Sequence, residues 1–498
     1  MQWQEGTKVE RQVAQMRSNR WSKTLKACVS FSLALLMTVG CGATQTNQVA
    51  LEPMEAEDAP SYSFDFIGGN DVMPIAGYFG PYISTYNEDG LVLPEYINEE
   101  TWEKIADAGI NLMSYSTVDY DIYPKEVMKN LEYGEKYGVA VVVSDSAVRN
   151  MGTTEEVDME ALTNRLSEYI NYPSFAGLYM IDEPCTSYFM PAGEDLQYRY
   201  LDYYKTIAPI LNQEVGMFTY ANAYPAGDKG NEFERYEQYI RDFCDTLQPN
   251  YLLFDKYPFD KEREGYIDRY FYNLAIVRMV AEEENIPFWT FIQAGSQWND
   301  SVKHFDSVTP YYPNEAQFDW NINTCLAFGA KGINYFPLIQ PDYFAYAESE
   351  LFDFQRNGIL GAYGNKTQWF YYAQNISKQI KAIDEVLMNS VNKGVIVSGE
   401  QAQKDLSLTK DYKVLMEGTS WRELTGVNGD ALIGCFNYQG KTALYIVNYS
   451  MEQAQKIDLA FQDTYRVTKI QNAETKQLEG NGITLDMQPG EGVLLVFE

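Results

Sequence analysis

Short apolar runs alternate with longer amphipathic stretches from about residue 71 to residue 388. The apolar runs have the length of buried strands and cover residues 73–79, 110–116, 139–145, 175–182, 215–222, 251–258, 287–294 and 331–338. One stretch with apolar residues at helical spacing follows each run, at 99–109, 126–138, 159–170, 196–211, 235–247, 266–284, 315–330 and 367–388. Apolar strands that alternate with helices are typical of parallel βα units.

Eight such units predict an α/β fold, a closed (β/α)₈ TIM barrel, rather than an open doubly wound sheet. No glycine-rich phosphate loop follows the first run, as a dinucleotide-binding sheet would require. After residue 391 the pattern changes to short alternating runs such as GVIVSG and KTALYIVNYS, which predict an antiparallel β-sandwich. We therefore expect a signal peptide at 1–40, a flexible linker at 41–61, the barrel at 62–392 and the β-sandwich at 393–498.

The first forty residues have the pattern of a secretory leader. Six basic residues precede the apolar run VSFSLALLMTVG, which is short for a membrane span. The tetrapeptide Thr38-Val39-Gly40-Cys41 resembles a bacterial lipobox, and the resemblance implies cleavage before Cys41 and a lipid on its thiol. An uncleaved N-terminal anchor is the alternative. Either one predicts an exported protein that is lipid-anchored or otherwise tethered to the cell membrane.

The charge of the chain excludes one class of partner. The formal net charge is −32, and it becomes −36 without the leader, whose six basic and two acidic residues sum to +4. No basic surface is then expected to neutralise phosphates, so no nucleic acid partner is predicted.

Cysteine and histidine usage gives no sign of a metal site. Cys185, Cys244, Cys325 and Cys435 are far apart in the chain, and buried free thiols are the simplest expectation. His304 is the single histidine, which excludes a multi-histidine metal centre, and its loop-like surroundings argue against a Ser-His-Asp triad. We expect neither a metal nor another cofactor.

The ends of the predicted barrel strands carry carboxylates, amides and aromatic rings. In barrel enzymes the reacting groups lie at these C-terminal strand ends. Aromatic rings stack on sugar rings, amides and carboxylates bind hydroxyl groups, and two carboxyl groups can cleave an acetal, so this inventory predicts a carbohydrate substrate. The substrate-binding residues expected on this basis are Tyr78, Tyr115, Asp145, Asp182, Tyr220, Asn222, Tyr257, Gln293, Trp298, Tyr335 and Asp342.

The stretch FAGLYMIDEP ends the fourth predicted strand on Asp182, Glu183 and a proline. A polar turn after a strand would explain it. A glutamate before proline at this position also resembles the clan of barrel glycoside hydrolases that contains the β-galactosidases. That resemblance implies that Glu183 is the general acid/base, that Asp182 orients its neighbours, and that a C-terminal β domain follows the barrel.

The seventh predicted strand departs from the clan's pattern. The clan places a nucleophilic glutamate there, whereas this chain has PFWTFIQAGSQW with Gln293, and an amide cannot act as the nucleophile. Asp255 interrupts an apolar run at the end of the sixth strand and is the best replacement, with a purely structural carboxylate as the alternative. Asp145 and Asp342 are weaker candidates.

Two functions remain open at this point. The first is an exported, membrane-tethered glycoside hydrolase that cleaves oligo- or polysaccharides. The second is a surface glycan-binding lipoprotein on a scaffold that has lost catalysis. For the first, the separation of Glu183 from the nearest carboxylate would indicate the stereochemistry, since retaining pairs lie about 5–5.5 Å apart and inverting pairs about 6.5–9.5 Å.

The lipobox predicts the behaviour of one variant. Substituting Cys41→Ala should release the protein from membranes, because the thiol is the site of lipid attachment. Fractionation of cells into membrane and soluble material measures this. Membrane retention of Cys41→Ala with its leader removed would contradict a lipid anchor at this cysteine.

Overall fold

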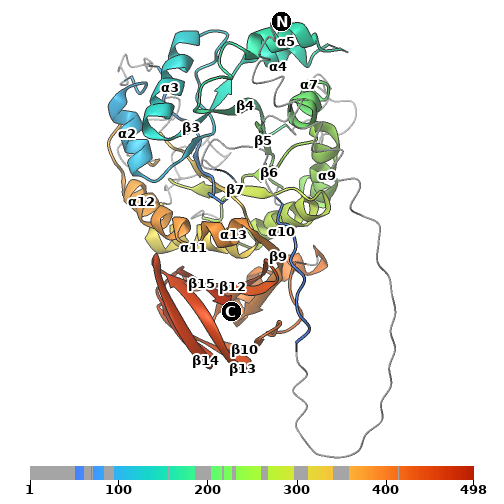
Figure 1. Cartoon of the computed structure of the whole chain (residues 1–498), viewed down its shortest axis with the longest axis vertical. Helices are drawn as coiled ribbons and strands as arrows, with labels where there is room; N and C mark the ends of the chain where they lie inside the picture. Colours follow the sequence, from blue (N-terminus) through green and yellow to red (C-terminus); the bar gives the residue numbers. More distant parts are fainter. Residues whose placement is uncertain are drawn as a thin grey trace, which may run out of the picture.

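The computed structural model describes residues 51–60, 69, 71–83, 95–154, 156–184, 204–215, 218–226, 231–259, 267–295, 312–339, 358–412 and 414–498. Several residues considered above lie outside these ranges, namely the tetrapeptide that ends at Cys41, and Cys185, Trp298, His304 and Asp342. The chain forms a barrel ringed by helices, with a second, all-β part packed against one side of it (Figure 1).

Eight parallel strands form the closed barrel, which confirms the predicted fold class. They are β1 (Ile75–Gly77), β2 (Leu112–Met113), β3 (Ala140–Ser144), β4 (Phe175–Asp182), β5 (Phe218–Ala223), β6 (Leu252–Phe254), β7 (Phe288–Gln293) and β8 (Ile333–Phe336). Each strand pairs with the next, and β1 pairs with β8 in parallel, with Ile75 opposite Ile333. Seven of them fall within the apolar runs predicted for them, and β5 extends one residue beyond its run.

The helices cover the outside of the barrel. Their bounds are α2 (Glu99–Asp107), α3 (Pro124–Tyr137), α4 (Ser146–Met151), α5 (Met159–Leu166), α7 (Ile207–Pro209) with a π-helix at Ile210–Glu214, α8 (Asn231–Glu234), α9 (Tyr236–Leu247), α10 (Ile267–Glu283), α11 (Glu315–Ala327), α12 (Gln368–Lys381) and α13 (Asp384–Met388). Local sequence sets several of these boundaries. Asn98 caps α2 by accepting from the Thr101 N–H, and Asn314 and Gln317 form a capping box at α11.

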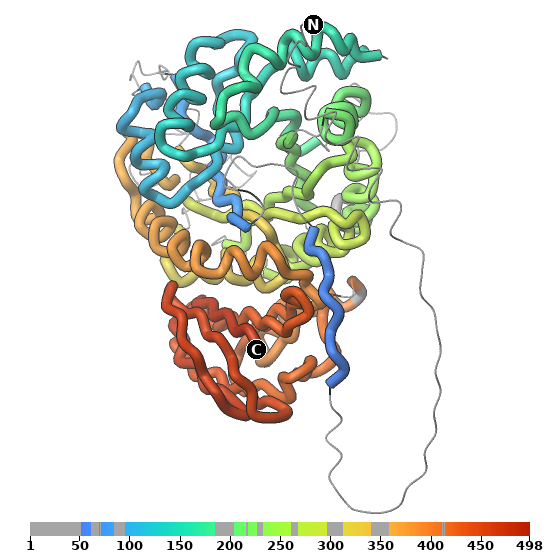
Figure 2. The backbone as a smooth tube through the Cα atoms, viewed as in Figure 1, coloured from blue at the N-terminus to red at the C-terminus, as the bar shows by residue number. Residues whose placement is uncertain are grey.

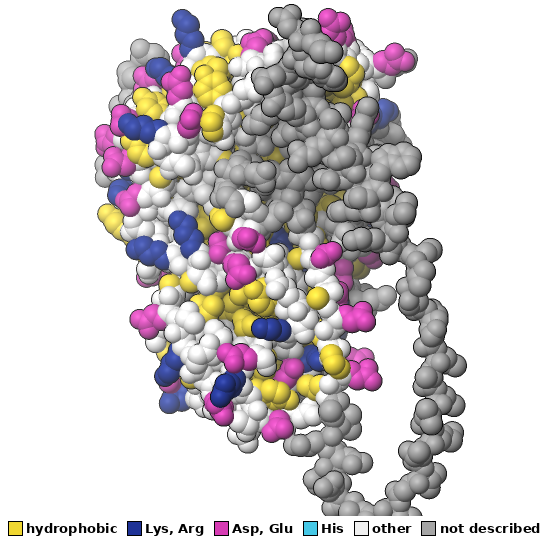
Figure 3. Space-filling model, viewed as in Figure 1, with side chains coloured by type: hydrophobic (Ala, Val, Ile, Leu, Met, Phe, Trp, Pro, Cys, Tyr) yellow, Lys and Arg dark blue, Asp and Glu magenta, His cyan; other side chains and the backbone are white. Residues whose placement is uncertain are grey.

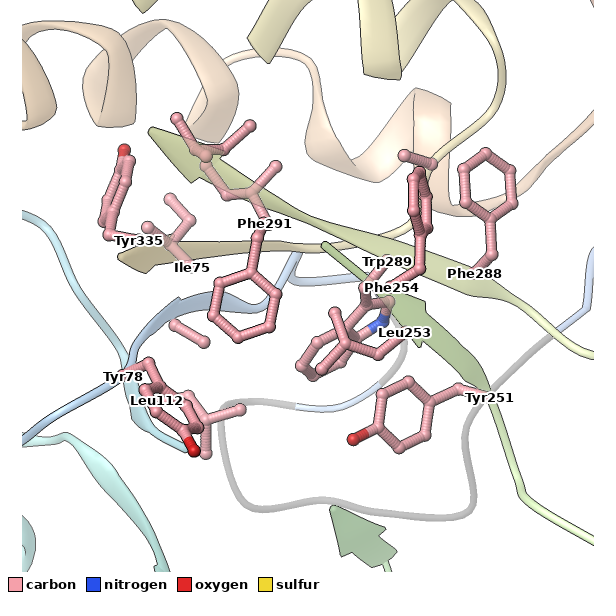
Figure 4. Close-up of a cluster of buried hydrophobic side chains, with 14 of the residues drawn as sticks. Ile75, Tyr78, Leu112, Tyr251, Leu253, Phe254, Phe288, Trp289, Phe291 and Tyr335 are labelled. Carbon is pink, nitrogen blue, oxygen red and sulfur yellow. The ribbon is translucent and has the colours of Figure 1, made fainter. Parts of the chain in front are cut away.

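Alternate side chains along the barrel strands point to opposite sides. Figure 4 shows Phe291 and Tyr335 on opposite sides of the strands that carry them. Phe291 lies inside, where its ring centroid is 5.5 Å from that of Tyr78, and Tyr335 lies outside, stacked on Phe318 of α11. This period of two fixes which strand-end residues can reach the interior of the barrel.

The C-terminal part is an antiparallel sheet, as predicted. Its strands are β9 (Ser390–Ser398), β10 (Leu424–Asn428), β11 (Ala431–Tyr438), β12 (Lys441–Asn448), β13 (Gln455–Gln471), β14 (Glu474–Met487) and β15 (Gly492–Phe497), with α14 (Glu400–Asp405) and a 3₁₀-helix at Ser407–Tyr412 after the first strand. They form one continuous sheet. β13 and β14 pair along their length, while the first half of β13 also pairs with β10 and the second half with β15. This arrangement gives a sandwich-like domain without two separate sheets.

The central strands β11, β12 and β15 are buried on both faces, whereas β13 and β14 expose many of their residues. In β11, Leu432 and Phe436 pack with the barrel core, while Ile433 and Cys435 pack in a second core inside the C-terminal domain. β11, β12 and β15 contact α11, and α14 and the 3₁₀-helix contact α10. The two helices are therefore covered by the barrel on one side and by the C-terminal domain on the other.

Buried polar groups fix the junction between the two parts. The guanidinium of Arg278 on α10 donates to Asn392 Oδ1 at 2.9 and 3.1 Å, and Tyr445 OH donates to Asn323 Oδ1 of α11 at 2.7 Å. Lys331 is 4% exposed, and its ammonium donates to the carbonyls of Leu387, Met388 and Ser390. Burial lowers the pKa of Lys331 to about 7. These three side chains therefore have hydrogen-bond partners although they are buried.

The segment 51–60 runs beside the C-terminal strands (Figure 2). Both carboxylate oxygens of Glu57 lie 3.0 Å from Lys393 Nζ, and Asn437 Nδ2 donates to Glu57 Oε1 at 3.0 Å. Arg422 donates to the carbonyl of Glu52 at 2.7 Å. These contacts attach the segment to the C-terminal domain.

The outer surface and the helices show two further features of the described residues. On the face drawn in Figure 3, Lys and Arg side chains are scattered among Asp and Glu and form no continuous basic patch in the part that the structure describes. Among the described helices, none is long and apolar enough to cross a bilayer.

The close approach of β11 to α11 predicts the effect of one substitution. A Cβ at Gly434 would lie 2.3 Å from the carbonyl oxygen of Ala327, so Gly434→Ala must displace the helix or the strand. Thermal or urea unfolding should show a loss of about 1–3 kcal/mol. Gly426→Ala in β10 is the matched control, because a Cβ there meets the nearest atom at 3.9 Å. Equal stabilities for the two variants would contradict the packing described here.

Candidate active site

Three carboxyl groups meet at the C-terminal end of the barrel strands. Asp182 is the last residue of β4, Glu183 follows it, and Asp255 follows β6. Between them lies Asn222 of β5, which pairs in register with Asp182 on one side and with Leu253 on the other. The order of the strands therefore brings together residues that are far apart in the sequence.

Asp182 is held by two neutral donors. Tyr78 OH donates to Asp182 Oδ2 at 3.0 Å, and Asn222 Nδ2 donates to Asp182 Oδ1 at 3.0 Å. Protein surrounds the carboxylate, and this burial raises the pKa of Asp182, while both hydrogen bonds oppose the rise. The residue as a whole is nevertheless exposed to solvent at the end of β4.

Asp255 has a strongly raised pKa. It is 8% exposed, accepts from Asn222 Nδ2 at 2.9 Å, and is hydrogen-bonded to the side chain of Glu183. Burial, and then the charge of Asp182, raise the pKa of Asp255 to about 7, whereas the bonds from Asn222 and Glu183 and the charge of Lys256 oppose the rise. Since a hydrogen bond between two carboxyl groups needs a proton, the Glu183–Asp255 pair holds at least one proton while this bond exists.

The contact between Glu183 and Asp255 is closer than either separation expected for a reacting pair. A hydrogen bond brings two oxygens within about 3 Å, whereas retaining and inverting carboxyl groups are about 5 Å or more apart. A bound substrate would have to come between these two groups.

The backbone of Glu183 has an unusual conformation. Its φ angle is +47°, in the left-handed region that residues with a Cβ seldom adopt. Its N–H donates to the carbonyl of Asn222 at 3.0 Å, which holds the turn against β5. Strain of this kind concentrates at functional sites, because there the surrounding structure fixes a conformation that is locally unfavourable.

Tyrosine rings lie beneath the carboxyl groups. Tyr115 stacks on Tyr78 with a centroid distance of 4.7 Å, and Tyr179 stacks on Tyr220 at 5.2 Å. Tyr78 and Tyr220 are almost fully buried, while Tyr115 remains partly exposed. Burial, followed by the charge of Asp182, raises the pKa of Tyr78, so its hydroxyl stays protonated and keeps donating.

Tyr179 belongs to this cluster, although sequence reasoning missed it. Tyr179 and Asp182 are three residues apart, so a regular strand would point them to opposite sides. A register shift between Tyr179 and Ile181 places both inside the barrel. Tyr78 OH confirms this, because it lies 3.4 Å from Tyr179 OH and also bonds Asp182. The alternation of the sequence gave no sign of the irregularity.

Asp145 lies away from the three carboxyl groups and is fully engaged. It accepts from Arg165 Nε at 2.8 Å and from Tyr169 OH at 3.0 Å, and it caps α4 through the N–H groups of Ala147 and Val148. Asp119 is similar, since it accepts from Ser144, Ser146 and Arg149. These aspartates order the loops beside the site and offer no free carboxylate to a substrate.

Two other residues expected to bind substrate, Tyr335 and Gln293, contact other parts of the protein instead. Tyr335 faces the helices, because Phe336 is the β8 residue that points inward, with its ring 6.0 Å from Tyr78. Gln293 is 1% exposed, and its amide bonds the backbone of Phe259 in both directions, at 3.2 and 3.0 Å. Gln293 therefore holds the loop that follows β6 and carries Asp255. Tyr257 in that loop is partly buried, with its ring 5.7 Å from that of Phe336.

The described residues contain no other reactive centre of the kinds considered from the sequence. No group of three or more His, Cys, Asp or Glu side chains within them has the arrangement of a metal site. Cys244, Cys325 and Cys435 are buried free thiols, as expected.

Comparison with known proteins gives matches at the level of structure. No protein-family model matches the chain, and no curated protein sequence matches it. The structure is similar to a β-galactosidase from Rahnella, with a TM-score of 0.51, 9% identity, and coverage of 89% of this chain and 100% of the other. A catalytic mutant of a β-galactosidase from G. stearothermophilus matches with a TM-score of 0.49 and 9% identity, and the match covers 88% of this chain and 99% of the other. A family 39 glycoside hydrolase from the gut symbiont Bacteroides cellulosilyticus matches with a TM-score of 0.46 and 11% identity, and the match covers 86% of this chain and 82% of the other. At these identities the likeness shows the barrel fold alone.

The raised pKa of Asp255 predicts how stability depends on pH. The folded state binds this proton more tightly than the unfolded state, so ionisation of Asp255 destabilises the fold. As the pH rises from about 4 to about 7, this group should remove up to about 4 kcal/mol from the free energy of unfolding. Asp255→Asn, which cannot ionise, should therefore show a weaker decline over this range.

Chemical denaturation at a series of pH values measures the difference between the two proteins. Asp463→Asn in the C-terminal domain is the control, because Asp463 is exposed and its replacement should leave the decline as in the wild type. Parallel curves for the wild type and Asp255→Asn would show that Asp255 titrates normally.

Proposed function

We propose that the protein is a glycoside hydrolase that cleaves O-glycosidic bonds by carboxyl acid/base catalysis. The observation that carries the proposal is the hydrogen bond between the side chains of Glu183 and Asp255, together with the raised pKa of Asp255 of about 7. Acetal cleavage needs a proton donor next to a second carboxyl group, here one that ionises near neutral pH.

The geometry supports a role for each group. Glu183 would donate its proton to the glycosidic oxygen as the bond to the anomeric carbon breaks, so the leaving sugar departs as an alcohol. Asp255 would then act as the carboxylate that attacks the anomeric carbon or activates a water molecule. Asp182, held by Tyr78 and Asn222, would add negative charge next to the positive charge that develops on the sugar.

The second carboxylate of this site comes from β6 and not from β7. Gln293 at the end of β7 is bound to backbone on both sides of its amide, so it neither reacts nor faces a substrate. Asp255 occupies the neighbouring strand end and lies within hydrogen-bonding distance of Glu183. When the second carboxylate is on β6 instead of β7, both carboxyl groups still lie at the C-terminal end of the barrel strands.

Non-catalytic glycan binding is the second candidate. The observation that favours it is the amide at the end of β7, where the resembled clan has its nucleophile. A binding protein would still use the exposed edge of Tyr115 and the polar rim, but it would not need the proton that the Glu183–Asp255 pair holds.

We also propose that the protein acts outside the cell, tethered to the membrane through Cys41. The basic leader and the lipobox-like tetrapeptide support this. The attachment of segment 51–60 to the C-terminal domain supports an arrangement in which the tether leads from that domain and not from the catalytic end of the barrel.

Single substitutions test the catalytic roles. A screen of aryl glycosides, beginning with β-galactosides because of the Rahnella match, would first establish a substrate. Glu183→Gln should lower kcat by about 10²–10⁴-fold on substrates with poor leaving groups. It should cost less on substrates with acidic leaving groups, which need little protonation. Asp255→Asn should lower turnover on every substrate by at least as much.

Asn437→Leu is the control, because it removes a buried amide that lies far from the site and bonds only the segment 51–60 and its own turn. Full activity of Glu183→Gln on a natural glycoside would refute the acid assignment. Tight glycan binding by a wild type that hydrolyses nothing would favour the second candidate.

A further inference from the structure

Asn222 contacts all three carboxyl residues of the site. Its Nδ2 donates to Asp182 Oδ1 at 3.0 Å and to Asp255 Oδ1 at 2.9 Å, and its backbone carbonyl accepts from the N–H of Glu183 at 3.0 Å. Both N–H bonds of the amide are thus directed at carboxyl oxygens. Because these bonds diverge by about 120°, the two oxygens are about 5 Å apart.

The orientation of this amide is set by the carboxyl groups alone. Asn222 is 2% exposed, and its Oδ1 is buried without a hydrogen-bond partner among the described residues. A reversed amide would direct Oδ1 at two carboxyl oxygens, which would be repulsive. A buried acceptor without a partner lowers the stability of the folded protein. The orientation of the Asn222 amide therefore serves the carboxyl groups of the site and costs some folding stability.

We propose that Asn222 is a positioning residue that keeps Asp182 and Asp255 apart and so leaves Asp255 as the partner of Glu183. Two carboxyl groups that come into contact share one proton. If Asp182 and Asp255 paired in this way, Asp182 would compete with Glu183 for the carboxyl oxygens of Asp255. The amide prevents this by giving each aspartate its own N–H. The inference rests on the proposed function, because it assigns a role within that site.

The other ionisable groups around the pair act differently on the two aspartates, because Tyr78 bonds Asp182 whereas Glu183 and Lys256 act on Asp255. Those that face the site are Tyr78 from β1, Tyr115 after β2, Tyr179 from β4, Glu183 after β4, Tyr220 from β5 and Lys256 after β6. Burial raises the pKa values of the four tyrosines, so they remain neutral over the range in which carboxyl groups titrate. Among these groups, Glu183 and Lys256 are the ones that change or carry charge beside Asp255.

Titration of the aspartates by NMR tests the role without a substrate. The full chain is labelled with ¹³C at the aspartate carboxyl carbons, and Asp182→Asn and Asp255→Asn assign the two signals. Asn222→Leu removes both donors at nearly constant volume, and Asn222→Asp keeps the shape but replaces the donor by a fourth carboxyl group. We expect the apparent pKa of Asp255 to rise by about one to two units in both variants.

Asn323→Leu is the matched control, since it removes a buried amide at the junction with the C-terminal domain. It should leave both aspartate titrations within a few tenths of a unit. Thermal melts and near-ultraviolet circular dichroism identify variants that fold, and Asn222→Asp decides the outcome if Asn222→Leu does not fold. A folded Asn222 variant with an unchanged Asp255 titration would overturn the proposal.

Activity measurements separate this inference from the proposed function. On any glycoside that the wild type hydrolyses, the acidic limb of the kcat–pH profile should move upward with the Asp255 titration in the Asn222 variants. A purely structural role would lower stability without moving that limb. Absence of hydrolysis by the wild type would refute the proposed function, while the titrations would still decide whether Asn222 keeps the two aspartates apart.

Discussion

Closure of the eight-stranded parallel barrel is the constraint on which the site depends. Parallel strands place all their C-terminal ends on one rim, and closure makes β4, β5 and β6 consecutive neighbours there. Asp182, Asn222 and Asp255 are 40 and 33 residues apart in the chain, yet one amide bonds both carboxylates. An open sheet with another strand order would separate them.

The carboxylates of the rim fall into two classes according to their partners. Asp119 and Asp145 form ion pairs with Arg149 and Arg165, so they are structural groups. Asp182 and Asp255 are held mainly by neutral donors in surroundings rich in tyrosine. Without a guanidinium beside it, buried Asp255 has a pKa near neutrality, and only such a group can exchange a proton near neutral pH.

The C-terminal domain stabilises the barrel on the side that carries α10 and α11. Its central strands β11, β12 and β15 are buried on both faces, and Gly434 allows β11 to approach α11 closely. Arg278 and Asn323 reach across the junction with satisfied hydrogen bonds. These contacts lie on the outer helices and not among the carboxyl groups at the strand ends, so the domain supports the site without lining it.

The sequence by itself determined the barrel, the antiparallel C-terminal sheet and the rim that carries the chemistry, because period and run length follow directly from strand and helix geometry. It also identified Glu183 and Asp255 as carboxyl groups that interrupt apolar runs. Only the tertiary structure showed that Tyr335 faces outward, that Gln293 binds backbone, and that Asp145 is paired with Arg165. Tyr179 joined the site through a strand irregularity that no periodicity encodes. The pairing of Glu183 with Asp255 was likewise decided by packing, because side-chain contacts between strands depend on register and burial, which a linear pattern does not contain.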